Sequence, residues 1–118
     1  MCVFCEVISG KLPSKKVYED KHTLAFLNIK PDVPEHTLVV PKQHYKNLTD
    51  CPPEVLNHVM ATVKKLTKKY LQEKKYLTVK VVMNNEPPCQ SVPHLHIHIL
   101  PYMQADLDNR WTTSQVPV

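Results

Sequence analysis

The chain has 118 residues, of which 42% are hydrophobic and 22% are charged, and its formal net charge is +4. This length supports one domain with a core of its own, but not two. The modest positive charge suits phosphate-bearing ligands and falls short of that of a duplex-binding protein, so we expect no nucleic-acid partner. Because no apolar run approaches the length of a membrane span and the N-terminus lacks a signal-peptide pattern, we expect no membrane partner. The expected location is cytoplasmic, with the nucleus as a second compartment.

Cysteine and glycine usage narrows the chemistry. Four cysteines without a secretory signal predict thiols or metal ligands rather than disulfides. Gly10 is the single glycine, against eleven prolines. Turns must therefore be made by proline and asparagine, and a phosphate-binding loop cannot be glycine-rich.

The N-terminal half predicts a short helical turn followed by three strands. Cys2 and Cys5 form a CxxC motif, and Gly10 is a natural stop for the turn that follows. The residue pattern predicts strands over 16–20, 23–29 and 37–41. The last of these is a continuous apolar run, which is typical of a central strand buried on both faces.

The C-terminal half predicts one long helix and two more strands. Two prolines and an acidic residue in 50–54 mark a helix start, and apolar residues recur at helical spacing from Leu56 to Leu71. The lysines between them favour a solvated helix face over a nucleic-acid patch. Strands are expected over 77–83 and 93–100, with a polar loop at 84–89. The prediction is an α+β fold, a five-stranded antiparallel meander with one long helix, in a domain of residues 1–101 followed by a tail of residues 102–118.

The last strand has an unusual pattern, Pro93-His94-Leu95-His96-Ile97-His98-Ile99-Leu100. A period of two sends the three histidines to one face of a strand and the aliphatic residues to the other. Same-face neighbours lie roughly 6.6 Å apart, so His94 and His98 are about 13 Å apart at Cα, too far to share one metal ion with His96. The row therefore favours one imidazole acting on a substrate while its neighbours orient it or bind anions.

This stretch resembles the His-φ-His-φ-His-φ-φ signature of the histidine-triad family, where φ is an apolar residue. The preceding Gln90-Ser91-Val92 resembles the nucleotide-binding, phosphoramidase-like branch of that family, and further matches extend from Cys2 to Pro101. The resemblance implies a homodimer in which two five-stranded sheets join into one sheet of ten strands.

The resemblance also implies a covalent mechanism. In that family the middle histidine, here His96, attacks the α-phosphorus of a nucleotide, and water then hydrolyses the nucleotidyl-histidine intermediate. Neutral imidazole suits this role because it is nucleophilic near pH 7 and leaves readily. His98 is expected to contact the transferred phosphoryl oxygens, and Gln90 and Ser91 to approach the leaving group, where the serine hydroxyl can relay a proton. The alternatives are a loop-capping role for Ser91 and an ordinary surface amide for Gln90.

Substrate-binding residues are expected elsewhere in the chain. Asn28 matches the position that holds the ribose, and an amide can both donate and accept hydrogen bonds with sugar hydroxyls. Leu27 and Ile29 are candidate walls for a purine base, as is Phe4, although each can equally belong to the core. Asn84 and His98 complete the expected substrate-binding set. His36 and His94 are expected to orient the catalytic row.

Cys2, Cys5, His44 and His94 match the zinc ligand set of some histidine-triad proteins. Two cysteines and two histidines make a tetrahedral set, although the spacing is not that of a zinc finger. Four protein ligands leave no open position, so the zinc is expected to be structural. The alternative is a metal-free arrangement in which Cys5 is buried beside Phe4.

These observations predict a hydrolase or transferase that cleaves the P–N bond of purine nucleoside phosphoramidates. The alternatives are a dinucleoside-polyphosphate hydrolase and a nucleotide- or zinc-binding regulatory protein with incidental catalysis. Ser91 favours phosphoramidates, because a departing amine needs a proton more than a departing phosphate does. Two positions depart from the family pattern. Glu35 stands where many members carry glycine, and the loop 84–89 lacks the usual glycines. The glycine-poor loop favours the binding protein and bears on catalytic efficiency.

Overall fold

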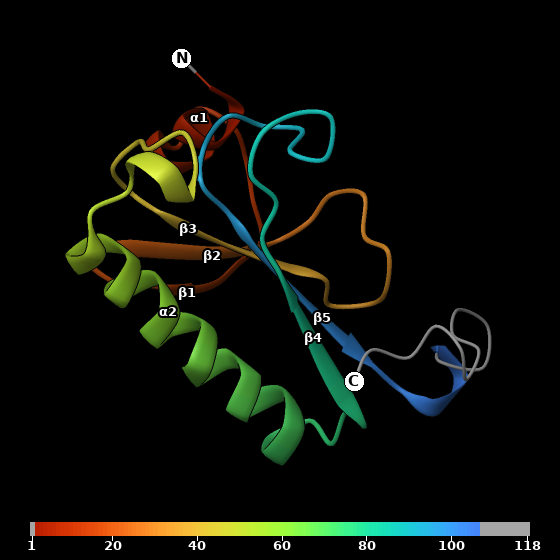
Figure 1. Ribbon diagram of the computed structural model, residues 1–118. Coiled ribbons are helices and arrows are strands. Elements are labelled where there is room, and N and C mark those ends of the chain that lie inside the picture. Colours follow the sequence, from red (N-terminus) through yellow and green to blue (C-terminus); the bar gives the residue numbers. More distant parts are fainter. Residues whose placement is uncertain (1, 107–118) are drawn as a thin grey trace.

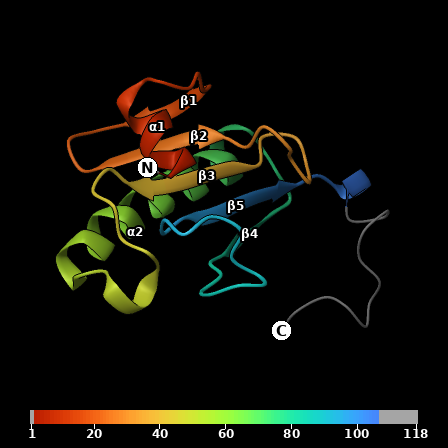
Figure 2. The same cartoon turned by 90° about the horizontal axis from the view of Figure 1, so that it is seen from above.

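The computed structural model describes residues 2–106, and within them five antiparallel strands form one sheet. The strand order is β1-β2-β3-β5-β4, which the labels of Figure 2 follow from top to bottom. The strands are β1 (Lys16–Glu19), β2 (Thr23–Leu27), β3 (Thr37–Pro41), β4 (Thr78–Val82) and β5 (Ile97–Tyr102). The predicted fold class, a five-stranded antiparallel sheet with one long helix, is confirmed.

The helices begin and end at the residues that the sequence marks. In α1 (Val3–Ser9) the Cys2 thiolate or thiol caps the first turn by accepting from the Cys5 N–H, and Gly10 closes the helix at a φ of 88°. A short 3₁₀ helix, η1 (Leu48–Asp50), precedes α2 (Pro53–Lys68), which starts on a proline. A π-helical turn, η2 (Lys69–Glu73), continues α2 toward β4. Figure 1 shows α2 running across one side of the sheet.

The strand order differs from the predicted meander at one step, because β5 lies between β3 and β4. β5 pairs antiparallel with both neighbours. The long helix between β3 and β4 crosses the sheet and returns the chain one strand further out. The histidine-bearing strand lies in the gap left beside β3 and is an interior strand of the sheet, paired on both sides.

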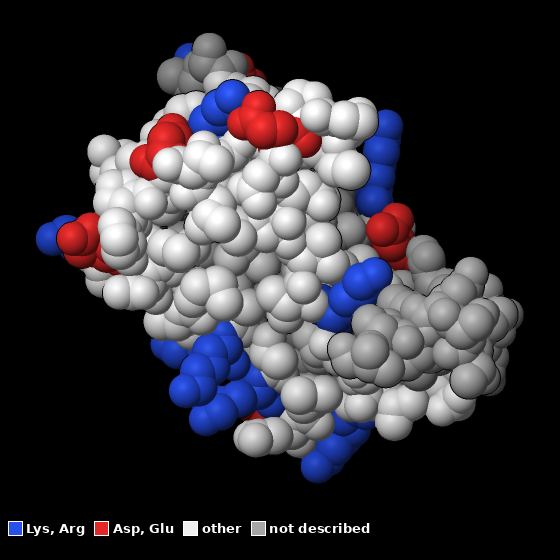
Figure 3. Space-filling view, viewed as in Figure 1, with Lys and Arg blue, Asp and Glu red and all other residues white. Residues whose placement is uncertain are grey.

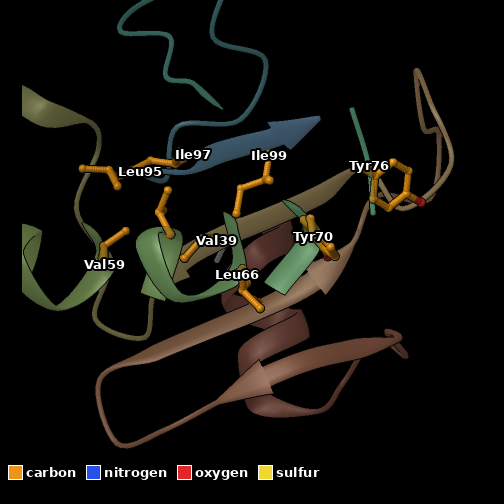
Figure 4. Close-up of a cluster of buried hydrophobic side chains, with 10 residues drawn as sticks. Val39, Val59, Leu66, Tyr70, Tyr76, Leu95, Ile97 and Ile99 are labelled. Atoms are coloured by element: carbon orange, nitrogen blue, oxygen red, sulfur yellow. The ribbon is translucent and has the colours of Figure 1, made fainter. Parts of the chain in front are cut away.

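Buried side chains form two main cores on the two faces of the sheet, and Val33, Leu100 and Tyr102 form a smaller third cluster. On one face α2 packs against alternate strand residues, as Figure 4 shows for Val59 and Leu66 against Val39, Ile97 and Ile99. On the other face α1 covers the intervening residues. This second core contains Phe4, Val7, Leu24, Phe26, Leu38 and Val40. Fully burying one such side chain contributes roughly 1.5–3 kcal/mol, so both helices are held by the sheet that they cover.

Two predicted strands have boundaries that the local hydrogen bonds correct. The strand predicted to reach Ile29 ends at Leu27, because the side chain of Asn28 accepts from the Lys30 N–H and turns the chain. The histidine strand begins at Ile97 rather than Pro93, because the Leu95 N–H donates to the carbonyl of Tyr45 and follows that loop instead of β3.

The alternation predicted for the histidine stretch nevertheless holds. Leu95, Ile97 and Ile99 all lie in the α2-side core, while the histidines face away from it. β5 continues to the buried Tyr102, one residue beyond the predicted domain boundary. Residues 107–118 of the predicted tail lie outside the described residues.

The surface of α2 agrees with a solvated face. Lys64, Lys65 and Lys68 are exposed, and Figure 3 shows lysines gathered at the lower left of this view, close to α2. None of the helices within residues 2–106 has both the length and the apolar character needed to cross a membrane.

Candidate active site

A groove of about 250 Å³ opens on the α1 side of the sheet and gathers several residues that the sequence singled out. Of the predicted site residues, Asn28, Ile29, Ser91, His96 and His98 line it. The rest of its wall is apolar, made by Val3, Phe4, Val7, Leu12, Phe26, Leu38 and Val92. A cleft with an apolar wall and a few convergent polar groups is the usual form of a small-molecule site.

His96 carries a lone pair that is available to a ligand in this groove. Its ring is 4% exposed, and burial lowers its pKa, which favours neutral imidazole. Its Nδ1 lies 2.8 Å from the carbonyl oxygen of His94. A carbonyl can only accept, so Nδ1 bears the proton and Nε2 keeps the lone pair. The Phe4 ring packs edge-on against His96 at 5.0 Å between centroids and fixes its plane.

His98 is held in the opposite tautomer by a hydrogen-bond chain from the loop before β3. The Asp32 N–H donates to Nδ1 of His36 at 3.2 Å, so the proton of neutral His36 lies on Nε2. His36 Nε2 then donates to Nδ1 of His98 at 2.9 Å. The proton of His98 must therefore lie on Nε2, where it can be donated to a bound oxygen. Burial, with repulsion from His96 and His36, lowers the pKa of His98 to about 4, so the ring is neutral at pH 7.

Two of the residues expected near the leaving group lie in different environments. Ser91 is exposed and lines the groove. Gln90 is buried and does not line it; its amide nitrogen donates to the carbonyls of Lys46 and Val92, and its oxygen accepts from Glu86 N–H and Asn47 Nδ2. Gln90 therefore holds the loop that carries Ser91 in place through these hydrogen bonds.

The residues expected to bind substrate fall into two groups, those that line the groove and those that do not. Asn28 and Ile29 line the groove, and Ile29 is 88% exposed. Leu27 and Asn84 are half-buried and do not line the groove.

Several wall residues were not predicted from the sequence. Val3 and Val7, one helical turn apart on α1, were missed, although their spacing marks one face of that helix. Asn47 was missed as well. It is fully buried and connects Gln90 to η1, and Asn47-Leu48-Thr49-Asp50 has the residues of a capping box.

The predicted metal ligands come together at the N-terminus of α1. The Sγ atoms of Cys2 and Cys5 and the Nδ1 atoms of His44 and His94 all lie within 4.8 Å of one another. The two sulfurs are 3.0 Å apart and the two nitrogens 3.1 Å apart. Two thiols and two imidazoles from three distant segments can thus hold one metal ion.

The hydrogen bonding of His94 supports a ligand role. Its Nε2–H donates to the carbonyl of Pro41 at 2.9 Å, so the lone pair lies on Nδ1 and points into the cluster. A ligand histidine ordinarily donates its second nitrogen to a carbonyl or carboxylate in this way. His94 also contacts His96, whose Nδ1–H donates to the backbone carbonyl of His94. The orienting role predicted for His94 stays a prediction.

Comparison with known proteins agrees with this combination of fold and histidine site. The family model of the HIT domain matches residues 9–105. An uncharacterised HIT-like protein of Methanocaldococcus jannaschii is 43% identical over 107 residues, covering 90% of this chain and 82% of that protein. The adenosine 5'-monophosphoramidase HNT1 of Saccharomyces cerevisiae is 39% identical over 101 residues, covering 85% of this chain and 61% of that protein.

Among solved structures, a Zn-bound histidine triad family protein from Mycobacterium smegmatis is 30% identical, with a TM-score of 0.84. The match covers 99% of this chain and 84% of that one. The chain belongs to the HIT family.

Proposed function

We propose that the protein hydrolyses purine nucleoside phosphoramidates at the α-phosphorus through a nucleotidyl intermediate on His96. The observation that carries the proposal is the pair of opposite tautomers, which presents a lone pair on His96 and an N–H donor on His98 to the same groove. A nucleophile beside a donor is what group transfer at phosphorus requires.

In the first step Nε2 of His96 bonds to the α-phosphorus and the bond from phosphorus to the departing amine breaks. The positive charge that develops on the ring is stabilised by the Nδ1–H bond to the His94 carbonyl. His98 Nε2–H donates to a non-bridging oxygen. Ser91, which is exposed at the groove, passes a proton from solvent to the departing amine. Water then attacks phosphorus, and the P–N bond to His96 breaks to release the nucleotide.

In this proposal Asn28 holds the ribose and Ile29 covers one face of the base; both line the groove, as does Phe4, which packs against His96. The similarity to a yeast adenosine 5'-monophosphoramidase supports an amine leaving group and an adenine nucleotide. A dinucleoside polyphosphate would use the same nucleophile with a phosphate leaving group, so the two substrates must be compared directly.

We further propose that the metal held by Cys2, Cys5, His44 and His94 is zinc. Thiolate and imidazole ligands suit this ion, and a zinc-bound relative has the same fold. When bound, it supplies a structural crosslink between α1 and the segments that flank β3 and β5. We also propose that the protein is a homodimer.

The test is steady-state kinetics on an adenosine phosphoramidate and a diadenosine polyphosphate, combined with rapid quench of labelled substrate. Wild type should prefer the phosphoramidate and yield a nucleotidyl adduct that maps to His96. His96→Ala should lose about four decades of turnover and all adduct, because the covalent pathway is removed. His98→Ala should cost about 10²- to 10³-fold.

His22→Ala is the matched control, because His22 is an exposed imidazole that stacks on His58 outside the groove. It should leave turnover unchanged. An adduct on His94 or His98, or substantial turnover by His96→Ala, would refute the assignment. Nucleotide binding without turnover in wild type would favour the binding protein.

A further inference from the structure

The loop before β3 contains a residue in an unfavourable backbone conformation. Glu35 has a φ of 63°, in the left-handed region. A side chain costs roughly 1–2 kcal/mol there relative to the right-handed conformation. Such a residue persists only where its surroundings hold it. Glu35 directly precedes His36, the residue that sets the tautomer of His98.

The side chain of Glu35 is held by two residues of the segment that follows η2, Lys74 and Tyr76. The Tyr76 hydroxyl donates to Oε1 at 2.6 Å, and Lys74 Nζ forms an ion pair with Oε2. Burial raises the pKa of Glu35, but the hydrogen bonds from Lys74 and Tyr76 outweigh it and lower that pKa below its ordinary value. Burial and the nearby Glu35 charge raise the pKa of Tyr76. The carboxylate is therefore charged and the phenol remains a donor at neutral pH.

The backbone around Glu35 connects the contacts of the Glu35 side chain to the groove. The Glu35 carbonyl accepts from the Thr37 hydroxyl at 2.8 Å, and the His36 carbonyl accepts from the Asn28 N–H at 2.9 Å. Glu35 and His36 are adjacent in the chain, but their side chains bond to different parts of the protein. The first is tied to the segment after α2, and the second donates to His98.

We propose that Glu35 is a positioning residue. Its ion pair with Lys74 and its hydrogen bond from Tyr76 hold the loop 31–36, so that His36 fixes His98 in the Nε2–H tautomer. The catalytic consequence rests on the proposed function. The tautomer consequence does not, because it concerns two imidazoles in the free protein.

The first measurement is nitrogen NMR of the histidine rings near neutral pH. Wild type should show single Nε2–H tautomers for His36 and His98 and an Nδ1–H tautomer for His96. In Glu35→Gly and Tyr76→Phe, His36 and His98 should become mixtures of tautomers while His96 is unchanged. Lys64→Met, which removes an exposed lysine elsewhere on α2, should match wild type.

The second measurement separates positioning from stability. Glu35→Gly relieves the backbone strain and also removes the contacts with Lys74 and Tyr76. These effects on stability oppose each other, so the melting temperature should change little. Its kcat on the phosphoramidate should nevertheless fall about tenfold with KM within about twofold, because a displaced donor affects developing charge more than binding. Glu35→Gln, which can still accept from Tyr76, should recover part of that loss.

The outcomes are distinguishable. If wild type neither turns over substrate nor forms an adduct, the proposed function fails and the NMR measurement alone decides the role of Glu35. If Glu35→Gly and Tyr76→Phe keep single tautomers at His36 and His98, the positioning role is refuted. Should Glu35→Gly fail to fold, Tyr76→Phe decides, since it leaves the backbone of the loop unaltered.

Discussion

At the scale of single residues, the site depends on where protons lie on chemically identical rings. Composition treats the histidines as equivalent, but one donates to a backbone carbonyl and another accepts from a neighbouring ring. The position of the proton on each ring is set either by a residue distant in sequence or by the adjacent backbone. The assigned roles predict separate effects of substitution in the groove.

Ser91 should discriminate between leaving groups. Ser91→Ala should slow phosphoramidates with basic amine leaving groups by about tenfold or more and affect activated aryl esters much less, because a relayed proton matters most for a basic leaving group. The measurement is kcat/KM for the two substrate types. An equal loss on both would instead show that Ser91 positions the substrate.

The free energy of unfolding should depend on pH through His98. Burial, with His96 and His36 as neighbours and Asp32 opposing them, lowers its folded pKa from 6.5 to about 4. Its contribution is therefore fully present above pH 6.5 and is lost as pH falls toward 4, because the unfolded chain takes up the proton first. Across that window this residue accounts for about 3 kcal/mol at most. Urea unfolding of wild type and His98→Gln at several pH values should show a shallower dependence in the variant; identical slopes would contradict it.

At the scale of elements, hydrophobic periodicity predicted the strands, the long helix and the two faces of the histidine strand. It failed where a polar group redirects the backbone. Asn28 ends β2 early, and the contact of Leu95 with the loop at Tyr45 delays β5. The position of β5 between β3 and β4 was also missed, since strand order depends on how far the crossover helix carries the chain.

A motif let the sequence predict that His96 and His98 share one site and that Cys2, Cys5, His44 and His94 share another, and the structure brings each set together. Their chemical roles stay predictions. The motif could not reveal that Gln90 is hydrogen-bonded to Lys46 and Asn47, because these residues lie more than 40 positions away in the sequence. The anomaly at Glu35 was visible in the sequence, but not its partners on the segment after α2.

The loop that carries Ser91 should depend on Gln90 for stability. Gln90→Ala removes four hydrogen bonds and leaves partly buried backbone groups unpaired, so the free energy of unfolding should fall by about 2 kcal/mol. Gln43→Ala, at an exposed glutamine, should have little effect. Denaturant unfolding together with kinetics separates the roles. Lost activity at full stability would show instead that Gln90 acts on the substrate.

At the scale of the whole molecule, the metal cluster joins three distant parts of the chain. Elemental analysis should find about one zinc per chain, and Cys5→Ala should lose it and melt about 10 °C lower, as expected when a tightly bound ligand is removed. Cys51→Ala and Cys89→Ala are matched controls, because both thiols lie outside the cluster. Wild type that binds no zinc on titration would exclude the site.

The assembly of the protein should depend on the free edge of the sheet at β4. β4 is an outer strand, and Val81 and the adjoining Leu77 are 44% and 56% exposed. Natural edge strands are usually protected by charge, a bulge or a covering element, and two apolar residues on such an edge favour pairing with another strand. Pairing of β4 with its counterpart in a second copy would extend the two five-stranded sheets into one of ten strands.

Sedimentation at micromolar concentrations should therefore give a dimer for wild type. Val81→Lys should give a monomer, because two introduced charges would face each other across the symmetric edge. Leu48→Lys places the same charge at an equally exposed leucine on η1, away from β4, and should remain dimeric. A wild-type monomer would contradict the dimer. A dimer that persists in Val81→Lys would place the interface on another surface.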